Sequence, residues 1–336
     1  MKTSVILGTS ILTAAALTAC ADLSDDRFRR AIPSEKSVTV NAPQGNGSAL
    51  TSADATAGDM SDYYKTTYKV SHDVNNGIAA FLRLIKDITA QPATTRTDNE
   101  RTWGPGADAL DPAIYRLVMT EDATDHFSYA LEARPKGTDD VDANYLPLIS
   151  GTSDISTDIN DGSGTLTLHI DNWQLTDPTS CATGSLDAIY DTTIEPQFLT
   201  VAFNGFDPCD GSSDGDKPLT AASYYYARFV DGSGNFQFVV VGDVHDGAIQ
   251  PPINETLAIR SRWDALGEGR ADVSITGGDL LSHDGIAAVT ASECWDPTFG
   301  LTFATIDPVI IDPSHVVGVE SNCPAGLQTA EYTSDL

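Results

Sequence analysis

The stretch FSYALE, residues 127–132, shows the pattern on which the fold prediction rests. Its larger apolar side chains alternate with small or polar ones, so that one set points to each side of an extended chain. This period of two is typical of a β-strand with one buried and one wet face, as in antiparallel sheets. The same alternation recurs in LTLHI (166–170) and LAIRSRW (257–263). The sequence therefore predicts a mainly β protein.

The region between residues 101 and 305 contains roughly ten to twelve such strands, judged from their spacing and turn signals. DGSG occurs at 161–164 and again at 231–234, and its glycines suit the tight turns of β-hairpins. A single curved antiparallel sheet, either a closed barrel or an open half-barrel, would shield this many apolar faces. A β-sandwich of two sheets is the alternative architecture.

One helix is expected ahead of the strands. Six apolar residues are spaced so that they share one helix face: Val74, Ile78, Phe81, Leu82, Ile85 and Ile88. Ser71 or Asp73 can cap the start of this helix, and Pro92 stops it. We expect this N-terminal amphipathic helix to lie in the concave face of the curved sheet.

The first 20 residues have the layout of an export signal. Lys2 precedes an apolar run of roughly a dozen residues, shorter than the ~20 that a membrane-spanning helix requires. Leu17–Cys20 (LTAC) then resembles the lipobox of bacterial lipoproteins, in which the precursor is cut before the cysteine and the cysteine is acylated. The resemblance implies a signal peptide at 1–19 and a lipid anchor, such as palmitate, on Cys20. An ordinary cleaved signal with an incidental cysteine is the alternative.

The residue after Cys20 bears on localisation. In well-studied Gram-negative cells an Asp at this position retains a lipoprotein at the inner membrane, and this chain has Ala21 there. We therefore expect a cell-envelope protein at the outer membrane, on either its periplasmic or its surface face.

The chain divides into four predicted parts. After the signal peptide, residues 20–70 comprise the acylated cysteine and a segment rich in small and polar residues, which we expect to be a flexible tether with a reach of ~35 to 40 Å. Residues 71–323 form a single β-rich domain that includes the helix, and 324–336 form a C-terminal tail.

Four cysteines remain beyond Cys20 in a chain predicted to be exported. Cys181, Cys209, Cys294 and Cys323 favour two disulfides in an oxidising compartment. Three pairings are possible, and the sequential one joins Cys181 to Cys209 and Cys294 to Cys323. A structural zinc site is the alternative, but the chain has no C-x-x-C spacing to support it.

The charge of the chain limits its partners. A net charge of −29 supplies no basic surface for phosphates, so we expect no nucleic-acid partner. Asp207, Asp210, Asp214 and Asp216 crowd one loop and form a weak candidate calcium site, because clustered carboxylates repel unless a hard cation bridges them. Ala221 stands where an EF-hand loop has its bidentate Glu. A solvated acidic loop is the alternative, and no other cofactor is expected.

No catalytic motif is complete. GSSDG (211–215) fits G-x-S-x-G around Ser213, but the sequence after it does not predict the helix that a nucleophile elbow needs. GDVHD (242–246) resembles one segment of metallophosphoesterases, and the other metal-binding segments of those enzymes are missing. Asp243 and Asp246 could form an acid pair of an envelope hydrolase, which is the least favoured function. We expect a protein that is not an enzyme.

Three consecutive tyrosines are the other candidate binding residues. Tyr224, Tyr225 and Tyr226 point alternately to the two sides of one strand, so at least one lies on the outer face, where its ring could stack on a sugar or a protein partner. Packing in the core with the hydroxyl at the surface is the alternative.

Two short motifs carry a wider resemblance. RTWGP (101–105) and ECWDPTF (293–299) resemble large predicted envelope lipoproteins without an assigned activity. The resemblance implies an extracytoplasmic β domain and carries no catalytic residues with it. The leading expectation is a binding or structural lipoprotein that holds an apolar ligand in a half-barrel. A surface recognition module for a glycan or protein, dependent on calcium in one version, is the alternative.

Overall fold

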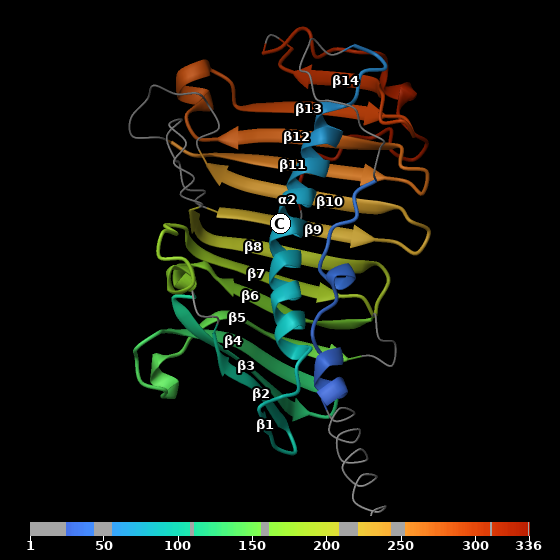
Figure 1. Ribbon diagram of the computed structural model, residues 1–336. Helices are drawn as coiled ribbons and strands as arrows, with labels where there is room; N and C mark the ends of the chain where they lie inside the picture. Colours follow the sequence, from blue (N-terminus) through green and yellow to red (C-terminus); the bar gives the residue numbers. More distant parts are fainter. Residues whose placement is uncertain are drawn as a thin grey trace, which may run out of the picture.

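The computed structural model describes residues 25–43, 56–107, 111–155, 161–207, 221–242, 253–309, 311–334 and 336. Fourteen strands form one antiparallel sheet, in which each strand pairs with the next along the chain (Figure 1). The strands are β1 (Thr95–Arg96), β2 (Glu100–Gly106), β3 (Ala113–Ala123), β4 (His126–Pro135), β5 (Leu146–Ile155), β6 (Gly162–His169), β7 (Thr183–Asp191), β8 (Gln197–Asp207), β9 (Ala221–Arg228), β10 (Gly234–Gly242), β11 (Glu255–Trp263), β12 (Gly269–Gly277), β13 (Ala288–Trp295) and β14 (Leu301–Asp307).

The predicted fold class is confirmed. The sheet is curved and open, with β1 and β14 at its two edges, so the half-barrel form of the prediction holds and the closed barrel does not. The β-sandwich alternative is wrong, because all fourteen strands belong to one sheet. Each connection along the chain therefore joins two strands that lie side by side in the sheet.

The two faces of the sheet differ as the alternating sequence predicts. We call the face that carries the long helix α2 (Asp62–Thr89) the front face and the opposite one the back face. On β11, Ile259, Ser261 and Trp263 point to the front and are buried, whereas Arg260 and Arg262 point to the back. Ser261 shares a hydrogen bond of 2.6 Å with Thr67 of α2, which places the helix on this face.

Helix α2 crosses the front face from β13 toward β2 (Figure 1). Ile78, Leu82 and Ile85 of the predicted apolar face are buried, and the helix ends before Pro92. Its N-cap is Ser61, ten residues before Ser71 and twelve before Asp73, the two predicted caps, because the Oγ of Ser61 accepts the backbone N–H of Tyr64. Its first turns pack through aromatic and hydroxyl side chains, which an apolar periodicity does not reveal. No helix in the described residues is long and apolar enough to cross a membrane.

The predicted flexible tether over 20–70 is wrong for the part that the structure describes. Residues 25–43 lie beside α2, and Phe28, Ala31, Val38 and Val40 are buried in the main core. The segment has few large apolar groups, but nearly all of them are buried, and a buried Asp25 fastens its start to the sheet. Composition averaged over 50 residues concealed these anchors. This segment contains the short 3-10 helix η1 (Glu35–Ser37), and a second one, η2 (Asp142–Asn144), lies between β4 and β5.

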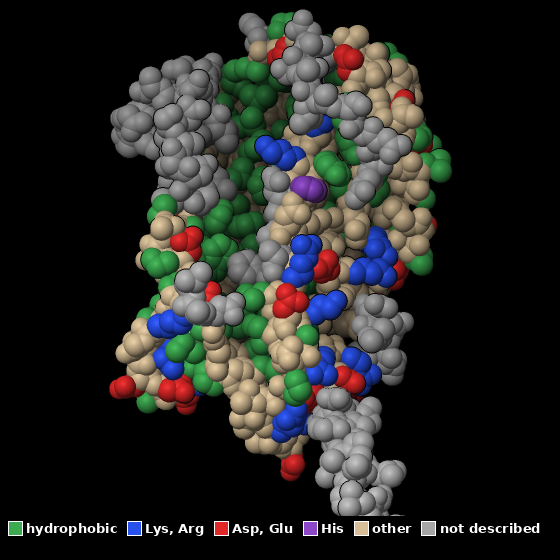
Figure 2. All heavy atoms as spheres, in the orientation of Figure 1, with side chains coloured by type: hydrophobic (Ala, Val, Ile, Leu, Met, Phe, Trp, Pro, Cys, Tyr) green, Lys and Arg blue, Asp and Glu red, His purple; other side chains and the backbone are tan. Residues whose placement is uncertain are grey.

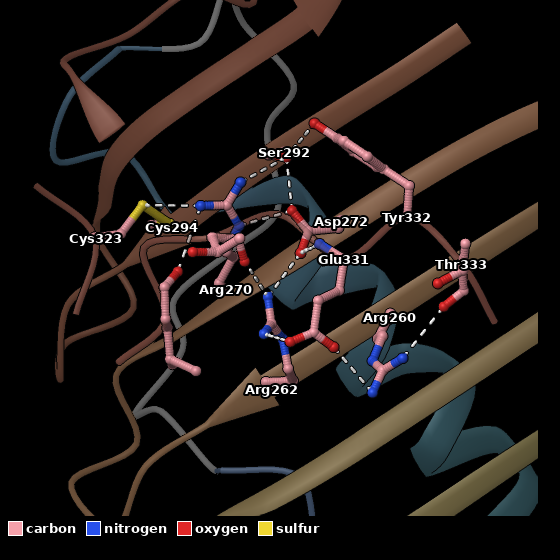
Figure 3. A network of polar contacts seen from close by, with 12 residues as sticks. Arg260, Arg262, Arg270, Asp272, Ser292, Cys294, Cys323, Glu331, Tyr332 and Thr333 are labelled. Carbon is pink, nitrogen blue, oxygen red and sulfur yellow. Dashed lines mark hydrogen bonds and ion pairs between the residues drawn. A yellow bond between two sulfur atoms is a disulfide. The ribbon is translucent and has the colours of Figure 1, made fainter. Parts of the chain in front are cut away.

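The C-terminal stretch 324–336 is not a separate tail, and this expectation is also corrected. Its described residues run along the back face of β10–β13, where Glu331 and Tyr332 bond to side chains of the sheet (Figure 3). The short helix η5 (Glu320–Asn322) lies between β14 and this stretch of the chain, and a π-helical turn, η4 (Leu280–Asp284), lies between β12 and β13. The domain therefore extends beyond both limits, 71 and 323, predicted for it.

Candidate functional site

A cavity of about 830 Å³ lies between the second half of α2, the front face of β2–β5 and the short helix η3 (Ile170–Leu175). Most of its wall is apolar. The main apolar side chains come from three strands and two helices: Leu84, Ile88, Trp103, Leu131, Leu148 and Trp173. Its volume lies in the range of about 300–1,000 Å³ that is typical of sites for small ligands.

Local structure explains why this space is held open. The indole Nε1 of Trp103 on β2 donates to the backbone carbonyl of Gln91, at 2.9 Å, which fixes the end of α2 relative to the sheet. On the other side, Asn172 in η3 donates to the carbonyl of Pro147 on β5, at 2.7 Å. Both walls are therefore tied to the sheet by hydrogen bonds while the space between them stays unfilled.

Gly104 shapes the floor of the cavity at the β2–β3 pair. Its φ is +93°, and a Cβ built on it would lie 2.6 Å from the carbonyl oxygen of Tyr115. Only glycine combines this backbone conformation with such a close approach. The pairing of β2 with β3 shifts register beside it, between Trp103 and Gly106.

Arg116 of β3 borders the cavity, but its side chain points to the back face, as does that of Glu132, which lies opposite it on β4. The guanidinium of Arg116 donates to Glu132 at 2.6 Å and to Asp142 at 2.7 Å, and lies 3.8 Å from the centre of the Tyr145 ring. Burial disfavours its charge, but the hydrogen bonds to the two carboxylates prevail and raise the pKa of Arg116. The remaining charged group among the described lining residues is Asp111.

The described lining residues of the cavity include few titratable groups. Asp111 is the single carboxylate among its described lining residues, so the pair of facing acids that glycoside hydrolysis uses is not formed there. Burial, and secondarily the charge of Asp111, raises the pKa of Tyr115 and keeps its phenol neutral. An apolar wall with a few polar groups at its margin favours an apolar ligand.

The apolar surface continues along the sheet beside α2. Figure 2 shows hydrophobic side chains gathered on the front face next to the helix, on its left in this view. Phe203, Phe238, Leu257 and Ile275 point to this face from β8, β10, β11 and β12 and are half-buried. The cavity is thus one end of a longer apolar front face.

A second constellation lies on the back face, where arginines from β11 and β12 surround Asp272 (Figure 3). The carboxylate of Asp272 is buried and accepts from Arg270 Nε at 2.7 Å, from Arg262 Nη2 at 2.9 Å and from Ser292 Oγ at 2.6 Å. It also accepts the backbone N–H of Glu331, at 3.0 Å. These bonds fasten the C-terminal residues to the sheet.

This network is structural. Burial opposes the charge of Arg270, yet the pKa of Arg270 is raised because Asp272 and Glu320 accept its hydrogen bonds. The carboxylate of Glu331 pairs with Arg260 at 3.0 Å and also with Arg262. The carboxylates of Asp272, Glu320 and Glu331 accept hydrogen bonds from arginines, and these bonds hold the C-terminal part of the chain to the sheet.

A third constellation joins the start of α2 to β13. Glu293 is 1% exposed, and its Oε2 accepts from Ser61 Oγ at 2.5 Å and from the backbone N–H of Tyr63 at 3.0 Å. His315 Nε2 lies 3.3 Å from the other oxygen. Because the carboxylate separates Ser61 from His315, the imidazole is not placed as a base for the serine. Burial raises the pKa of Glu293 despite the opposing hydrogen bonds from Ser61 and Tyr63.

The three predicted tyrosines divide between the two faces. Tyr224 and Tyr226 point to the front face and are buried, 0% and 4% exposed. Tyr225 points to the back face and is half-buried, with its ring stacked on Phe198 at a centroid distance of 6.4 Å. Tyr225 is therefore the one of the three on the outer face, and the other two belong to the core.

The predicted acidic and catalytic residues fall largely outside the described residues. Asp207 ends β8, whereas Asp210, Asp214 and Asp216, together with Ser213, Asp243 and Asp246, lie outside. In the part of the chain that the structure describes, no group of three or more His, Cys, Asp or Glu side chains could hold a metal. The calcium site and the acid pair remain predictions.

One predicted disulfide is present. Cys294 on β13 is bonded to Cys323, as the sequential pairing predicts, so a zinc site at these two residues is wrong. Cys181 is also disulfide-bonded, and its predicted partner Cys209 lies outside the described residues. Cys20 lies outside them too, and its acylation remains a prediction.

The cavity residues were not identified from the sequence. Trp103 appeared only within the motif RTWGP, and Trp173 and Leu148 gave no separate signal. A wall built from strands, a helix end and a 3-10 turn depends on long-range packing, which periodicity does not report.

Comparison with known proteins returned no matching family model, no matching curated protein and no matching solved structure.

Proposed function

We propose that this protein is a non-enzymatic lipoprotein of the cell envelope that binds an apolar ligand in the cavity at the end of α2. The observation that supports this function best is the cavity itself, about 830 Å³ with a mainly apolar wall, on the open face of a curved sheet. The lipobox at Leu17–Cys20 supports the anchor, and Ala21 supports sorting to the outer membrane.

The lining indicates the class of ligand. Leu84, Ile88 and Leu131 offer aliphatic contact, and the two indoles offer flat apolar surfaces. A single acyl chain or a flat hydrocarbon would gain ~0.8 kcal/mol for each methylene it buries here. A strongly charged ligand is disfavoured, because most of the cavity wall is apolar and would desolvate the charge.

Binding of a fluorescent fatty acid, titrated into detergent-free protein, tests this function. Trp103 and Trp173 line the cavity, so energy transfer from their indoles to a bound anthroyloxy fatty acid reports occupancy at this place. We expect saturable binding by wild type and a loss of affinity of about tenfold or more in Ile88→Glu, because the new carboxylate would be desolvated by the ligand.

Leu266→Glu is the matched control. It makes the same kind of substitution at a turn where Leu266 is 71% exposed, away from the cavity. Equal affinity in the two variants, or no saturable binding by wild type, would contradict the proposed function.

A further inference from the structure

We infer that the end of the molecule formed by residues 25–43, the second half of α2 and β1–β2 faces an anionic lipid surface, so that the cavity opens toward the bilayer. This orientation rests on the lipid anchor proposed at Cys20. It is argued from the length of chain between that cysteine and the fold, from the contacts of the N-terminal segment and from the distribution of charge.

The chain leaves little room between anchor and fold. Asp25 is fully buried and accepts from Arg96 Nη2 at 2.7 Å and from Arg101 Nε at 3.1 Å. Only four residues separate it from Cys20, and even a fully extended chain spans at most about 18 Å over these five steps. An acylated Cys20 therefore holds this end of the sheet close to the membrane surface.

The same contacts connect the anchored segment to the cavity. Asp25 accepts the backbone N–H of Ala93, the residue after Pro92, which lines the cavity. Arg29 donates to the carbonyl of Gln91, at 3.2 Å, and this carbonyl also accepts from Trp103. The cavity therefore shares its wall with the residues nearest the anchor.

Charge is distributed unevenly along the chain. Residues 25–101 carry ten Lys or Arg and ten Asp or Glu, whereas the remainder carries nine basic and 38 acidic residues and thus the whole net charge of −29. Figure 2 shows Lys and Arg side chains gathered along α2 and the N-terminal segment. An anionic bilayer repels the acidic remainder and attracts basic groups by about 1 kcal/mol each near its surface.

The residues at this end suit contact with lipid. Arg30, Lys36 and Lys86 are exposed, and the exposed Arg83 pairs with Glu35 at 3.2 Å. Leu84 is 40% exposed and also lines the cavity, so an apolar side chain lies at its mouth among basic ones. Basic groups that flank an apolar opening match anionic headgroups above hydrocarbon chains.

Energy transfer to labelled lipids tests the orientation. The full chain, exported and acylated, is reconstituted into vesicles of phosphatidylcholine and phosphatidylglycerol that carry a headgroup-linked acceptor. A donor dye is placed either at Lys86→Cys or at Leu266→Cys, beside β11. Along α2, Lys86 lies about 28 Å from the level of β11, which Thr67 contacts. We expect transfer at least about twofold greater from position 86.

The outcomes separate this inference from the proposed anchor. Flotation of the same vesicles shows whether the protein is membrane-bound. Protein that does not float refutes both the proposed anchor and the orientation that depends on it. Protein that floats but gives equal transfer from both positions, or more from 266, refutes the orientation alone. Arg30→Glu with Lys36→Glu is expected to reduce the difference, and Lys69→Glu, at an exposed position in the first half of α2, is not.

Discussion

Replacing Asp25 by Ala tests whether residues 25–43 belong to the folded domain. Asp25 receives four hydrogen bonds, two from Arg96, one from Arg101 and one from the backbone N–H of Ala93. Burial alone would raise the pKa of Asp25, but these bonds and the two arginine charges outweigh it, and the pKa is lowered. The carboxylate therefore stabilises the fold above the usual carboxyl pKa, and this contribution is lost as the pH falls below it.

The cost of the substitution depends on whether each arginine can reach water once the carboxylate of Asp25 is removed. Breaking a buried ion pair costs about 3–5 kcal/mol. Arg96 is 31% exposed and can turn to water, whereas Arg101 is 7% exposed and cannot, so the lower figure of about 3 kcal/mol applies. The fraction of molecules with a released N-terminal segment should then rise about 100-fold.

Trypsin cleavage after Arg27, Arg29 and Arg30 measures that fraction. Cleavage of a segment that opens and closes rapidly follows its open population, so its rate should increase by the same factor. Asp26→Ala is the matched control, because Asp26 is 58% exposed and pairs only with Arg29 among the described residues. Such a surface pair contributes about 0.5 kcal/mol or less. Equal cleavage rates in the two variants would refute the assigned role of Asp25.

Three further changes probe the rest of the fold. Asp272→Ala leaves the fully buried Arg270 without its main partner and should cost about 3–5 kcal/mol in chemical unfolding, with the C-terminal residues becoming sensitive to carboxypeptidase; unchanged digestion would contradict this. Replacing both Cys294 and Cys323 by Ser opens a loop of 29 residues and should lower the unfolding free energy by about 3–4 kcal/mol. Because the pKa of Glu293 is raised, wild-type stability should fall as the pH rises above 4.5 through that pKa, and Glu293→Gln should remove this slope in thermal unfolding measured as a function of pH. Identical slopes would show that Glu293 does not titrate there.

Local patterns were sufficient to predict the sheet and most of the helix. The alternation in FSYALE reappears as Phe127, Tyr129 and Leu131 on the buried front face of β4. The apolar face of α2 packs on the sheet through Ile78, Leu82 and Ile85, as the spacing predicts. The period of the apolar residues indicates which face of a strand or helix is buried, and the turn residues indicate where a strand ends.

The two ends of the domain were mispredicted because they are held by single polar contacts. Asp25 and Glu331 are ordinary acidic residues in the sequence, and their roles depend on arginines 71 and 69 positions away. Composition cannot reveal such pairs. The start of α2 was missed for a related reason, because Ser61 caps the helix while a distant Glu293 binds both Ser61 and Tyr63.

The candidate site was predicted only as a general feature. A half-barrel with a helix in its concave face implied an apolar interior, but the position of the space at the end of α2 depends on Trp103, η3 and the backbone of Gly104. The predicted tyrosines proved mainly to be core residues, because two of three consecutive strand residues share one face.

The measurement that tests the central claim most directly is native mass spectrometry of the protein, exported and purified without detergent. We expect wild type to carry a small apolar molecule that dissociates on denaturation, and Ile88→Glu to carry less of it than Leu266→Glu. Wild type that is free of bound mass and that also fails to bind the fluorescent fatty acid would contradict a ligand-binding cavity.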